Sequence, residues 1–249
     1  NKQFNEVHDL SLLAGASYNS DKFDNAEFNS NGGFTNDVVT TLNKAAGITG
    51  NTTESKNVLL SYFGRAQYAF DGKYLLSASI RRDGSSRFGT NTKWGWFPSA
   101  SVGWRVSEEN FMQGISQISD LKLRASWGKA GNYNVGDYSG IATLANYNYT
   151  FNGVQVIGQA PNRIVNPDVS WEVSNTFDVG LDFGLFSNRI TGAFDVYTKN
   201  NSNLLLNIPI PQTTGFSTLL GNTGEVKNQG WEFEITSRNL TGGFQWSTT

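Results

Sequence analysis

The chain has no cysteine, one methionine and one histidine among its 249 residues. Without cysteine it can form no disulfide, no cysteine-type zinc site and no thiol nucleophile. Proline is also scarce, with 5 residues. No apolar run approaches the roughly 18 residues that a membrane-spanning helix requires. A disulfide scaffold and a helical membrane protein are therefore excluded, whereas a membrane barrel of alternating strands gives a weaker signal and stays possible.

Charge of either sign is also modest. The chain carries 19 Lys and Arg against 21 Asp and Glu, a net charge of −2, and the basic residues are spread along the sequence. A nucleic-acid partner would require a clustered basic surface, so none is expected. No glycine-rich phosphate loop with Walker-type or dinucleotide spacing occurs, and we expect no cofactor, no metal and no catalytic residue.

Aromatic residues are abundant, with 7 Trp, 9 Tyr and 17 Phe, and they favour strands over helices. Apolar and polar residues alternate with a period of two, which predicts about nine strands. Asp71-Gly72 predicts a tight hairpin and Ser187-Asn188 a second turn. The expected strands cover residues 8–18, 60–70, 74–81, 94–105, 121–127, 171–183, 190–199 and 231–235, and a ninth begins near Phe244.

The expected connections alternate between long and short. The long ones cover about 19–57, 131–168 and 200–229, rich in Asn, Gly, Ser and Thr, while 71–72 and 187–188 are tight. Short helices are expected at 107–117 and 36–46. Outer-membrane barrels sort their connections in this way, with tight periplasmic turns and long outer loops. The sequence therefore predicts an all-β, antiparallel, up-and-down transmembrane β-barrel, present in part as about nine strands of a larger barrel.

One face of each expected strand is apolar and is predicted to meet lipid. Trp94 and Trp104 lie ten positions apart on this face. At a rise of roughly 3.3 Å per residue and a tilt of about 40°, they stand on the order of 25 Å apart, the height of the apolar band between two aromatic girdles. The predicted girdle residues are Tyr68, Phe70, Tyr74, Trp94, Trp96 and Trp104.

The opposite face is too polar for a dry protein core and is predicted to line an aqueous lumen. We expect Arg124 on the fifth strand to pair with Asp182 on the sixth, because neighbouring antiparallel strands place them level. The predicted lumen-facing residues are Arg65, Gln67, Arg81, Lys122, Arg124, Asp178, Asp182, Asp195, Glu232 and Glu234.

Several segments resemble the SusC/RagA family of TonB-linked outer-membrane proteins, over nearly the whole chain. They are DGKYLL at 71–76, RRDGSSRFG at 81–89, WFPSA at 96–100, VGWR at 102–105, LKLRASWG at 121–128, GN at 131–132, NPD at 166–168, WE at 171–172, NTG at 222–224 and NQG at 228–230.

The resemblance implies a plugged barrel of about 22 strands in the bacterial outer membrane. Its expected partners are membrane lipid, a SusD-like surface lipoprotein and TonB, and its expected cargo is an oligosaccharide or a peptide. Residues 1–249 would be an internal part of the barrel domain. The plug, the TonB-contacting segment and the C-terminal strands are then expected outside this chain.

Other functions find little support. His8 could serve a catalytic triad, but no nucleophile-elbow pattern accompanies it. Asp21, Asp24, Glu27 and Asn29 lack the spacing of a calcium loop. Glu232 and Glu234 could suit the acid and base of a glycosidase, but strand alternation explains them without catalysis, so their place on the lumen wall is favoured.

The segment 133–149 is rich in aromatic and amide side chains. We predict that it contacts cargo through Tyr138, Tyr147 and Tyr149. The alternatives to a transporter wall are a soluble all-β carbohydrate-binding or hydrolytic domain and a passive porin, which lacks a plug. Membrane fractionation distinguishes the transporter wall from the soluble domain, because only the wall should need detergent. The sequence upstream of this chain distinguishes the transporter from the porin, because only the transporter has a plug.

Overall fold

The computed structural model describes residues 2–4, 7–34, 38 and 41–249. Ten strands form one antiparallel sheet, and two more form a separate hairpin. The sheet order is β1 (Lys2–Phe4), β2 (His8–Phe34), β3 (Ala45–Phe70), β4 (Tyr74–Ser85), β5 (Trp94–Arg105), β6 (Ile118–Asn132), β9 (Glu172–Leu185), β10 (Ile190–Pro209), β11 (Thr218–Thr241) and β12 (Gln245–Thr248). All nine expected strands are present, as β2–β6 and β9–β12.

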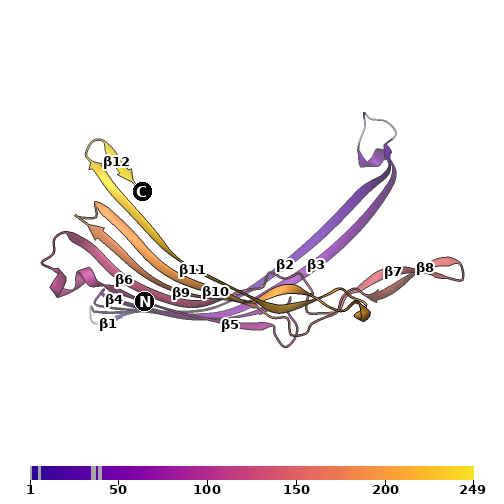
Figure 1. The fold of residues 1–249 in the computed structure, drawn as a ribbon, viewed down its shortest axis with the longest axis horizontal. Coiled ribbons are helices and arrows are strands. Elements are labelled where there is room, and N and C mark those ends of the chain that lie inside the picture. The colour runs from indigo at the N-terminus through magenta and orange to yellow at the C-terminus, as the bar shows by residue number, and fades with distance from the viewer. Residues whose placement is uncertain (1, 5–6, 35–37, 39–40) are drawn as a thin grey trace.

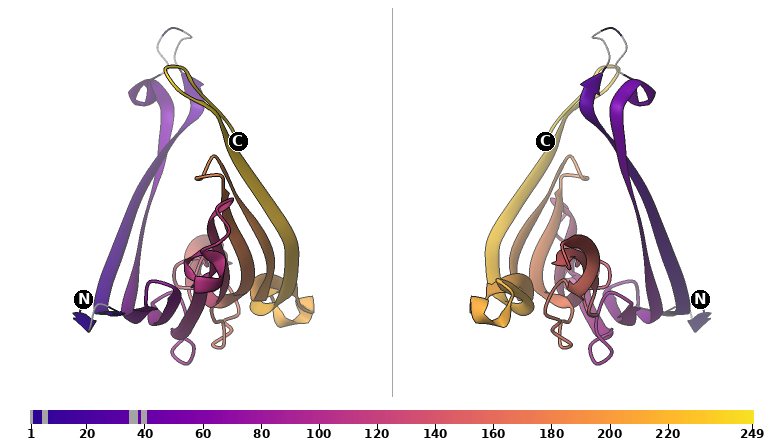
Figure 2. Two further views of the ribbon diagram at one scale, coloured as in Figure 1. Left: turned by 90° about the vertical axis from the view of Figure 1, so that its left-hand side faces the viewer. Right: turned by 90° about the vertical axis from the view of Figure 1, so that its right-hand side faces the viewer.

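The sheet is a single curved layer whose two long edges do not meet within this chain, as Figures 1 and 2 show. Each strand pairs with its neighbour in sequence, except that β6 pairs with β9 across the inserted β7–β8 hairpin. Large apolar side chains such as Phe177 and Trp231 are exposed by 48% and 70%. In the described residues no second sheet covers them, so a two-layer soluble sandwich is not the fold.

Tight turns lie at one end of the sheet, here called the short-turn end, together with the longer connection 106–117 between β5 and β6. Asp71 and Gly72 both have positive φ, at 52° and 63°, which is the backbone of the predicted two-residue hairpin turn. Ser187 and Asn188 also have positive φ, at 57° and 58°. Both predicted turns are therefore confirmed, and residues 242–244 connect β11 to β12 at the same end.

The opposite end, here called the long-loop end, differs from the expectation. Residues 19–57 and 200–229 were expected as long loops, but β2 pairs with β3 as far as Phe34 and Ala45, and β10 pairs with β11 as far as Pro209 and Thr218. Both hairpins extend well past their neighbours (Figure 1). Polar residues occupy both faces of these extensions, so the apolar alternation that marks the rest of each strand is lost.

The expected loop 131–168 also contains regular structure. Its β7 (Leu144–Phe151) and β8 (Val154–Pro161) pair with each other through an Asn152-Gly153 turn, both residues again having positive φ. This hairpin and β1 were not expected. Figure 1 shows β7 and β8 projecting from the long-loop end, beyond the sheet.

The helical expectations were wrong in type. Residues 107–117 contain two single 3₁₀ turns, η2 (Val106–Glu108) and η3 (Asn110–Met112). Of the expected helix 36–46, only η1 (Leu42–Lys44) is helical, and residues 36, 37, 39 and 40 lie outside the described residues. A fourth turn, η4 (Gln212–Thr214), joins β10 to β11. Over the described part of the chain, no helix is long and apolar enough to cross a membrane.

Candidate functional site: the polar face and the cluster at its outer end

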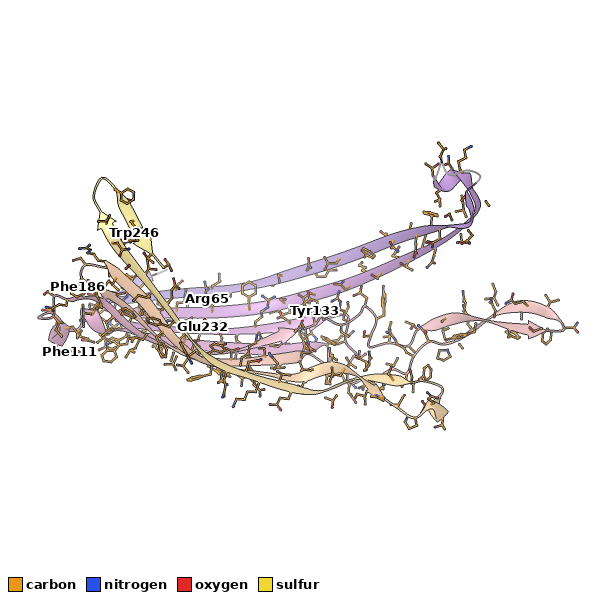
Figure 3. All side chains as sticks on the ribbon, turned by 45° about the horizontal axis from the view of Figure 1, so that its top comes forward. Arg65, Phe111, Tyr133, Phe186, Glu232 and Trp246 are labelled. Atoms are coloured by element: carbon orange, nitrogen blue, oxygen red, sulfur yellow. The ribbon has the colours of Figure 1, made fainter. Side chains whose placement is uncertain are left out.

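The strand register places the predicted lumen-facing residues on one surface, here called the polar face. Arg65 lies opposite Ser79, and Gln67 lies opposite Ser77. Further along the sheet, Lys122 lies opposite Asp182, and Asp195 lies opposite Glu232. Because side chains at alternate positions of a strand share a face, all ten predicted residues lie on this surface. Figure 3 labels Arg65 and Glu232 on strands toward opposite edges of the sheet.

Arg124 is the centre of the strongest charge cluster on the polar face. Its Nε lies 3.1 Å from Asp182 Oδ1, which confirms the predicted pair. Two further contacts were not predicted: Nη1 lies 3.3 Å from Asp178 Oδ1, and Nη2 lies 2.6 Å from Asp195 Oδ1. One guanidinium therefore bridges three strands, β6, β9 and β10, and its planar fork of donors suits several carboxylates at once.

A glycine provides the space for this bridge. Gly180 lies on β9 between Arg124 on β6 and Asp195 on β10 in the register. A Cβ atom at Gly180 would lie 2.4 Å from Asp195 Oδ1 and 2.5 Å from Arg124 Cζ. The missing side chain lets the arginine cross β9 and reach the third carboxylate. In the sequence, Gly180 stands between Asp178 and Asp182 at the alternate positions that face the polar side, and this glycine was the signal for the cluster.

The cluster still carries an excess of negative charge. Lys122 Nζ adds a longer contact of 3.6 Å to Asp182 Oδ2. Glu232 lies beside Asp195, and Glu234 lies beside Ala193 on the same face. Among the described residues neither glutamate has a cation within 4.0 Å. Side by side like charges are costly without solvent or a counter-ion, so this part of the polar face requires water or a cationic partner.

Arg81 organises a second group toward the long-loop end. Its Nε lies 2.7 Å from Asp83 Oδ1, and its Nη2 donates to Ser61 Oγ at 2.9 Å. Ser61 and Asp83 are buried. Small side chains dominate nearby, and the Ser79 and Ser99 hydroxyls are 2.7 Å apart. The polar face here is a close-packed hydrogen-bonded surface.

Aromatic side chains form two groups at opposite ends of the apolar face. At the short-turn end, Tyr74 and Trp104 stack with centroids 6.5 Å apart, and both donate hydrogen bonds to Glu109. These two bonds hold the pKa of the Glu109 carboxyl below its ordinary value. Phe70 continues this group beside Tyr74. Tyr68 joins it through His8, whose Nδ1 lies 2.7 Å from the Tyr68 hydroxyl.

At the other end of the apolar face, Trp94 stacks with Tyr62 at 6.2 Å between centroids. The guanidinium of Arg82 lies 4.5 Å from the centroid of Trp94 and 5.2 Å from that of Trp96. All six predicted girdle residues therefore fall in one of two bands, one at each end of the spanning strands. The faces of the two indole rings attract the guanidinium charge, and this attraction stabilises Arg82 on an otherwise apolar surface.

Trp171 departs from the predicted alternation. The alternation of the expected strand 171–183 predicts this side chain on the apolar face with Phe177 and Phe183, but β9 begins only at Glu172, and Trp171 turns toward the polar face, where it is 5% exposed. Its ring packs against Phe88, Phe97 and Tyr133 with centroid distances of 5.1, 5.3 and 5.6 Å. Its Nε1 donates to the carbonyl of Lys93 at 3.0 Å.

These contacts belong to a buried cluster of Phe88, Phe97, Val169 and Trp171, here called the loop cluster. It lies at the long-loop end, where Figure 3 labels the adjoining Tyr133. Four of the five buried apolar side chains in the described residues belong to it. Most of the closed apolar packing in the described residues therefore lies where the outer connections meet the polar face.

Polar contacts tie the surrounding connections to the loop cluster. Arg87 Nε lies 2.7 Å from Asp137 Oδ1. Partial burial raises the pKa of the Asp137 carboxyl, but hydrogen bonds from Ser55 and Arg87 lower it by more, and the net direction is below the ordinary value. Asn222 on β11 hydrogen-bonds both the amide and the carbonyl of Ser170, at 2.8 and 2.9 Å.

Two more contacts complete these ties. Glu172 accepts hydrogen bonds from Asn132 Nδ2 at 2.7 Å and from the amide of Leu205 at 2.8 Å. A Cβ at Gly89 would meet the carbonyl oxygen of Pro167 at 2.4 Å, so the two backbones touch. The segments RFG, GN, NPD, WE and NTG that carried the family resemblance thus converge on one place, from four parts of the sequence. The motifs indicated the family, but their convergence was visible only in the structure.

The three predicted cargo residues do not form one group. Tyr138 is held within the loop: its hydroxyl accepts a hydrogen bond from the amide of Lys56 at 3.0 Å, and its carbonyl accepts one from Arg163. Tyr147 and Tyr149 lie on β7 and are 53% and 55% exposed. The structure therefore joins two members of the group and leaves the third in a structural position.

The other candidate sites do not assemble. Asp24 pairs with Lys22 at 3.3 Å, on the face of β2 opposite Asp21 and Glu27, so the four oxygen ligands do not converge. In the part of the chain that the structure describes, no group of three or more His, Cys, Asp or Glu side chains is arranged to hold a metal ion.

A single curved antiparallel sheet with one apolar and one charged face, sorted connections and two aromatic bands defines the wall of an outer-membrane β-barrel. The family model for the TonB-dependent receptor-like β-barrel matches residues 1–249. The chain belongs to this family, whose members lie in the outer membrane.

Relatives support the same assignment. TonB-dependent receptor P39 of Formosa agariphila is 41% identical over 253 residues, which cover 100% of this chain and 24% of that protein. TonB-dependent receptor SusC of Bacteroides thetaiotaomicron is 38% identical over 199 residues, 77% of this chain and 20% of the relative. The chain thus spans about a quarter or less of the length of these relatives.

Solved structures agree on the fold. The RagAB peptide transporter matches with a TM-score of 0.86 and 30% identity, over 97% of this chain and 27% of that one. The siderophore receptor PirA from Pseudomonas aeruginosa matches with a TM-score of 0.57 and 13% identity over 98% of this chain and 39% of that one, a likeness of fold alone. The predicted SusC/RagA resemblance is confirmed.

Proposed function

We propose that this chain forms part of the wall of a SusC-type importer that takes up oligosaccharides or peptides using energy from TonB and works with a SusD-like surface lipoprotein. The observation that carries the proposal is the division of one sheet into two faces, with the Arg124 cluster on one and two aromatic bands on the other. The polar face lines the lumen, and the apolar face meets lipid.

The crowding of side chains supports this orientation. Ser61, Asp83 and Phe97 on the polar face are buried, whereas Leu76 and Val102 on the apolar face are 48% and 52% exposed. A curved sheet brings side chains together on its concave side and spreads them on its convex side. The concave side of a closing sheet becomes the barrel interior.

The aromatic bands support contact with lipid. Rings that carry one polar atom are favoured at the boundary between hydrocarbon and water. Trp104 places its indole N–H toward Glu109, and Trp94 lies beside the Arg82 charge, so each band has an apolar side and a polar side. An aqueous lumen supplies the solvent that Glu232 and Glu234 require on the other face.

The cargo is proposed as a class. RagAB is described as a peptide transporter, and sequence resemblance favours glycans, so both remain in the proposal. Tyr138, Tyr147 and Tyr149 stay predicted cargo contacts. Alanine replacement of all three in the full-length protein, with cargo binding unchanged, would remove that role.

The test uses the full-length protein in its own outer membrane. Uptake of fluorescent oligosaccharides and peptides is measured in cells with TonB and after TonB depletion. Uptake of one cargo class that stops on depletion is the expected result. Uptake that continues would show a passive porin, and a protein recovered in the soluble fraction without detergent would show that the chain is not a membrane wall at all.

A further inference from the structure

Arg82 is a cation on the apolar face. It lies on β4 opposite Tyr62 on β3 and Trp96 on β5. Among the described residues no carboxylate lies within 4.0 Å of its guanidinium, and its Nε is buried without a hydrogen-bond partner. The next residue, Asp83, binds Arg81 on the polar face instead. The described part of the protein therefore leaves the charge of Arg82 without a counter-ion.

Aromatic rings hold this guanidinium in place. A Cβ atom at Gly84 would lie 2.8 Å from the Trp94 ring, so the missing side chain lets the indole lie against the sheet. Tyr62 stacks beside Trp94 with an angle of 24° between the ring planes. The guanidinium of Arg82 lies over the rings of both Trp94 and Trp96, which attract its charge. The cation is thus fixed at one position on the surface.

An apolar groove lies beside the cation, toward the middle of the apolar face. Its volume is about 580 Å³. A Cβ atom at Gly64 would meet no atom closer than 3.9 Å, so the missing side chain leaves this surface open. Ile80 lies opposite Gly64 and two positions before Arg82, so the groove begins roughly 6.6 Å from the cation. On this face the groove is lined only by Leu12, Ala14, Gly64, Ala66, Ala78 and Ile80.

The cation and the groove lie in the order of a lipid headgroup and its chains. Arg82 belongs to the aromatic band at the long-loop end, and such bands mark the boundary between headgroups and hydrocarbon. In outer-membrane barrels the long connections are on the outer side. A lipid phosphate at Arg82 directs its acyl chain along the groove past Gly64. A free anion would use only the cation, and an uncharged lipid would use only the groove.

We propose that Arg82 and the groove at Gly64 bind one phosphorylated, acylated glycolipid of the outer leaflet. Arginine binds phosphate through two parallel N–H donors, and the indole rings orient this fork. The inference rests on the proposed function, which turns the apolar face toward lipid. It goes beyond that function because general contact with hydrocarbon requires neither a fixed cation nor a groove beside it.

The experiment titrates the full-length protein in detergent with lipid A, a phosphorylated glycolipid, and with lipid A whose phosphates have been removed. Native mass spectrometry counts the bound lipids. The test variant is Arg82→Gln, and the matched control is Arg105→Gln, which removes the same charge from the polar face of β5. We expect wild type and the control to prefer lipid A over the dephosphorylated form by more than about tenfold, a difference of about 1.4 kcal/mol. Arg82→Gln should bind both forms equally and weakly.

A second variant tests the groove and keeps the cation. Gly64→Leu fills the groove, and no atom lies close enough to the new Cβ to oppose the change. Both forms of lipid A should bind this variant more weakly than wild type, because both carry the acyl chains. Inorganic phosphate, which has no chain, should bind wild type far more weakly than lipid A does.

Wild-type affinity for lipid A in either Arg82→Gln or Gly64→Leu would overturn the inference. Inorganic phosphate that binds as tightly as lipid A would assign Arg82 to a free anion and would also overturn it. A lipid-free dimer that Arg82→Gln separates would overturn it in favour of a second copy of the chain. In each case TonB-dependent uptake would leave the transport function standing, whereas recovery of the protein without detergent would remove both.

Discussion

Arg124 reaches Asp195 at 2.6 Å by passing over a strand that lies between them. The intervening residue of β9 is Gly180, whose absent side chain leaves the space for the guanidinium. The contact therefore links β6 to β10 without the help of backbone pairing. The side-chain bridge joins three strands and neutralises part of the acidic surface.

Replacing Gly180 by alanine should break this bridge. The new Cβ would lie within 2.5 Å of atoms at the ends of both side chains, so they would separate rather than the backbone move. Loss of one charge-assisted hydrogen bond costs about 1.5–3 kcal/mol. We expect the urea midpoint of the detergent-solubilised full-length protein to fall accordingly.

The control for this substitution is Gly64→Ala, because a Cβ there would meet its nearest atom at 3.9 Å, an ordinary contact. Gly64 lies on β3, also within the spanning part of the sheet. If both variants unfold at the same urea concentration, the bridge contributes nothing measurable and the role given to Gly180 is wrong.

The spanning part of the fold was predictable because one face is apolar. Every strand predicted from alternation, from 8–18 to 231–235, is present in the structure. The alternation is strict in these segments because a one-residue slip in strand register would move the apolar side chains to the polar face. Beyond the membrane this constraint ends. The continuation of β2 and β3 through Asn, Ser and Thr residues carries no alternation, and only pairing in three dimensions shows it to be strand.

The site was predictable to a smaller extent. Arg124 and Asp182 lie level on adjacent strands, so their pair followed from register, but Asp195 is one strand further and became reachable only through Gly180. Trp171 was misplaced because alternation was extended one residue before β9 begins. The Asn152-Gly153 turn carried a strong hairpin signal between alternating residues. The prediction of one long loop over 131–168 did not use this signal.

A charge placed on either side of β5 should distinguish the two faces. Ala100 lies on the apolar face, midway between Trp94 and Trp104, and Ser101 lies on the polar face. Arginine at the lipid-facing midplane of a barrel costs about 2–4 kcal/mol. We expect Ala100→Arg to lower the unfolding free energy in lipid vesicles by this amount, and Ser101→Arg to change it by less than about 1 kcal/mol. Equal costs, or the reverse order, would contradict the proposed orientation of the sheet.

The loop cluster should depend strongly on Trp171. Removing this buried ring leaves a cavity against Phe88 and Phe97, and Trp→Ala changes in packed sites cost about 3–5 kcal/mol. Trp171→Phe keeps most of the packing and loses the hydrogen bond to Lys93, at about 1 kcal/mol. Limited proteolysis of the full-length protein should show cleavage within 133–171 far sooner for Trp171→Ala than for Trp171→Phe.

Trp96→Ala is the control for that comparison. Trp96 is 58% exposed on the opposite face and does not contact the loop cluster. Its removal should leave the protease resistance of 133–171 unchanged. Cleavage that is equally rapid in Trp96→Ala and Trp171→Ala would mean that the outer connections are held by the sheet as a whole.

The Arg87–Asp137 ion pair predicts a local dependence on pH. The pKa of Asp137 is lowered in the folded protein, so its carboxylate stabilises the loop fully above the unfolded pKa of about 3.9. That stabilisation is lost as the pH falls through the lower folded value. We expect amide hydrogen-exchange protection in 133–141, corrected for intrinsic exchange rates, to be constant from pH 7 to about 5 and to fall below pH 4. In Asp137→Asn the protection should already be reduced at pH 7 and should not show this fall. A wild-type profile that matches the Asn variant at every pH would mean that the ion pair does not hold the loop.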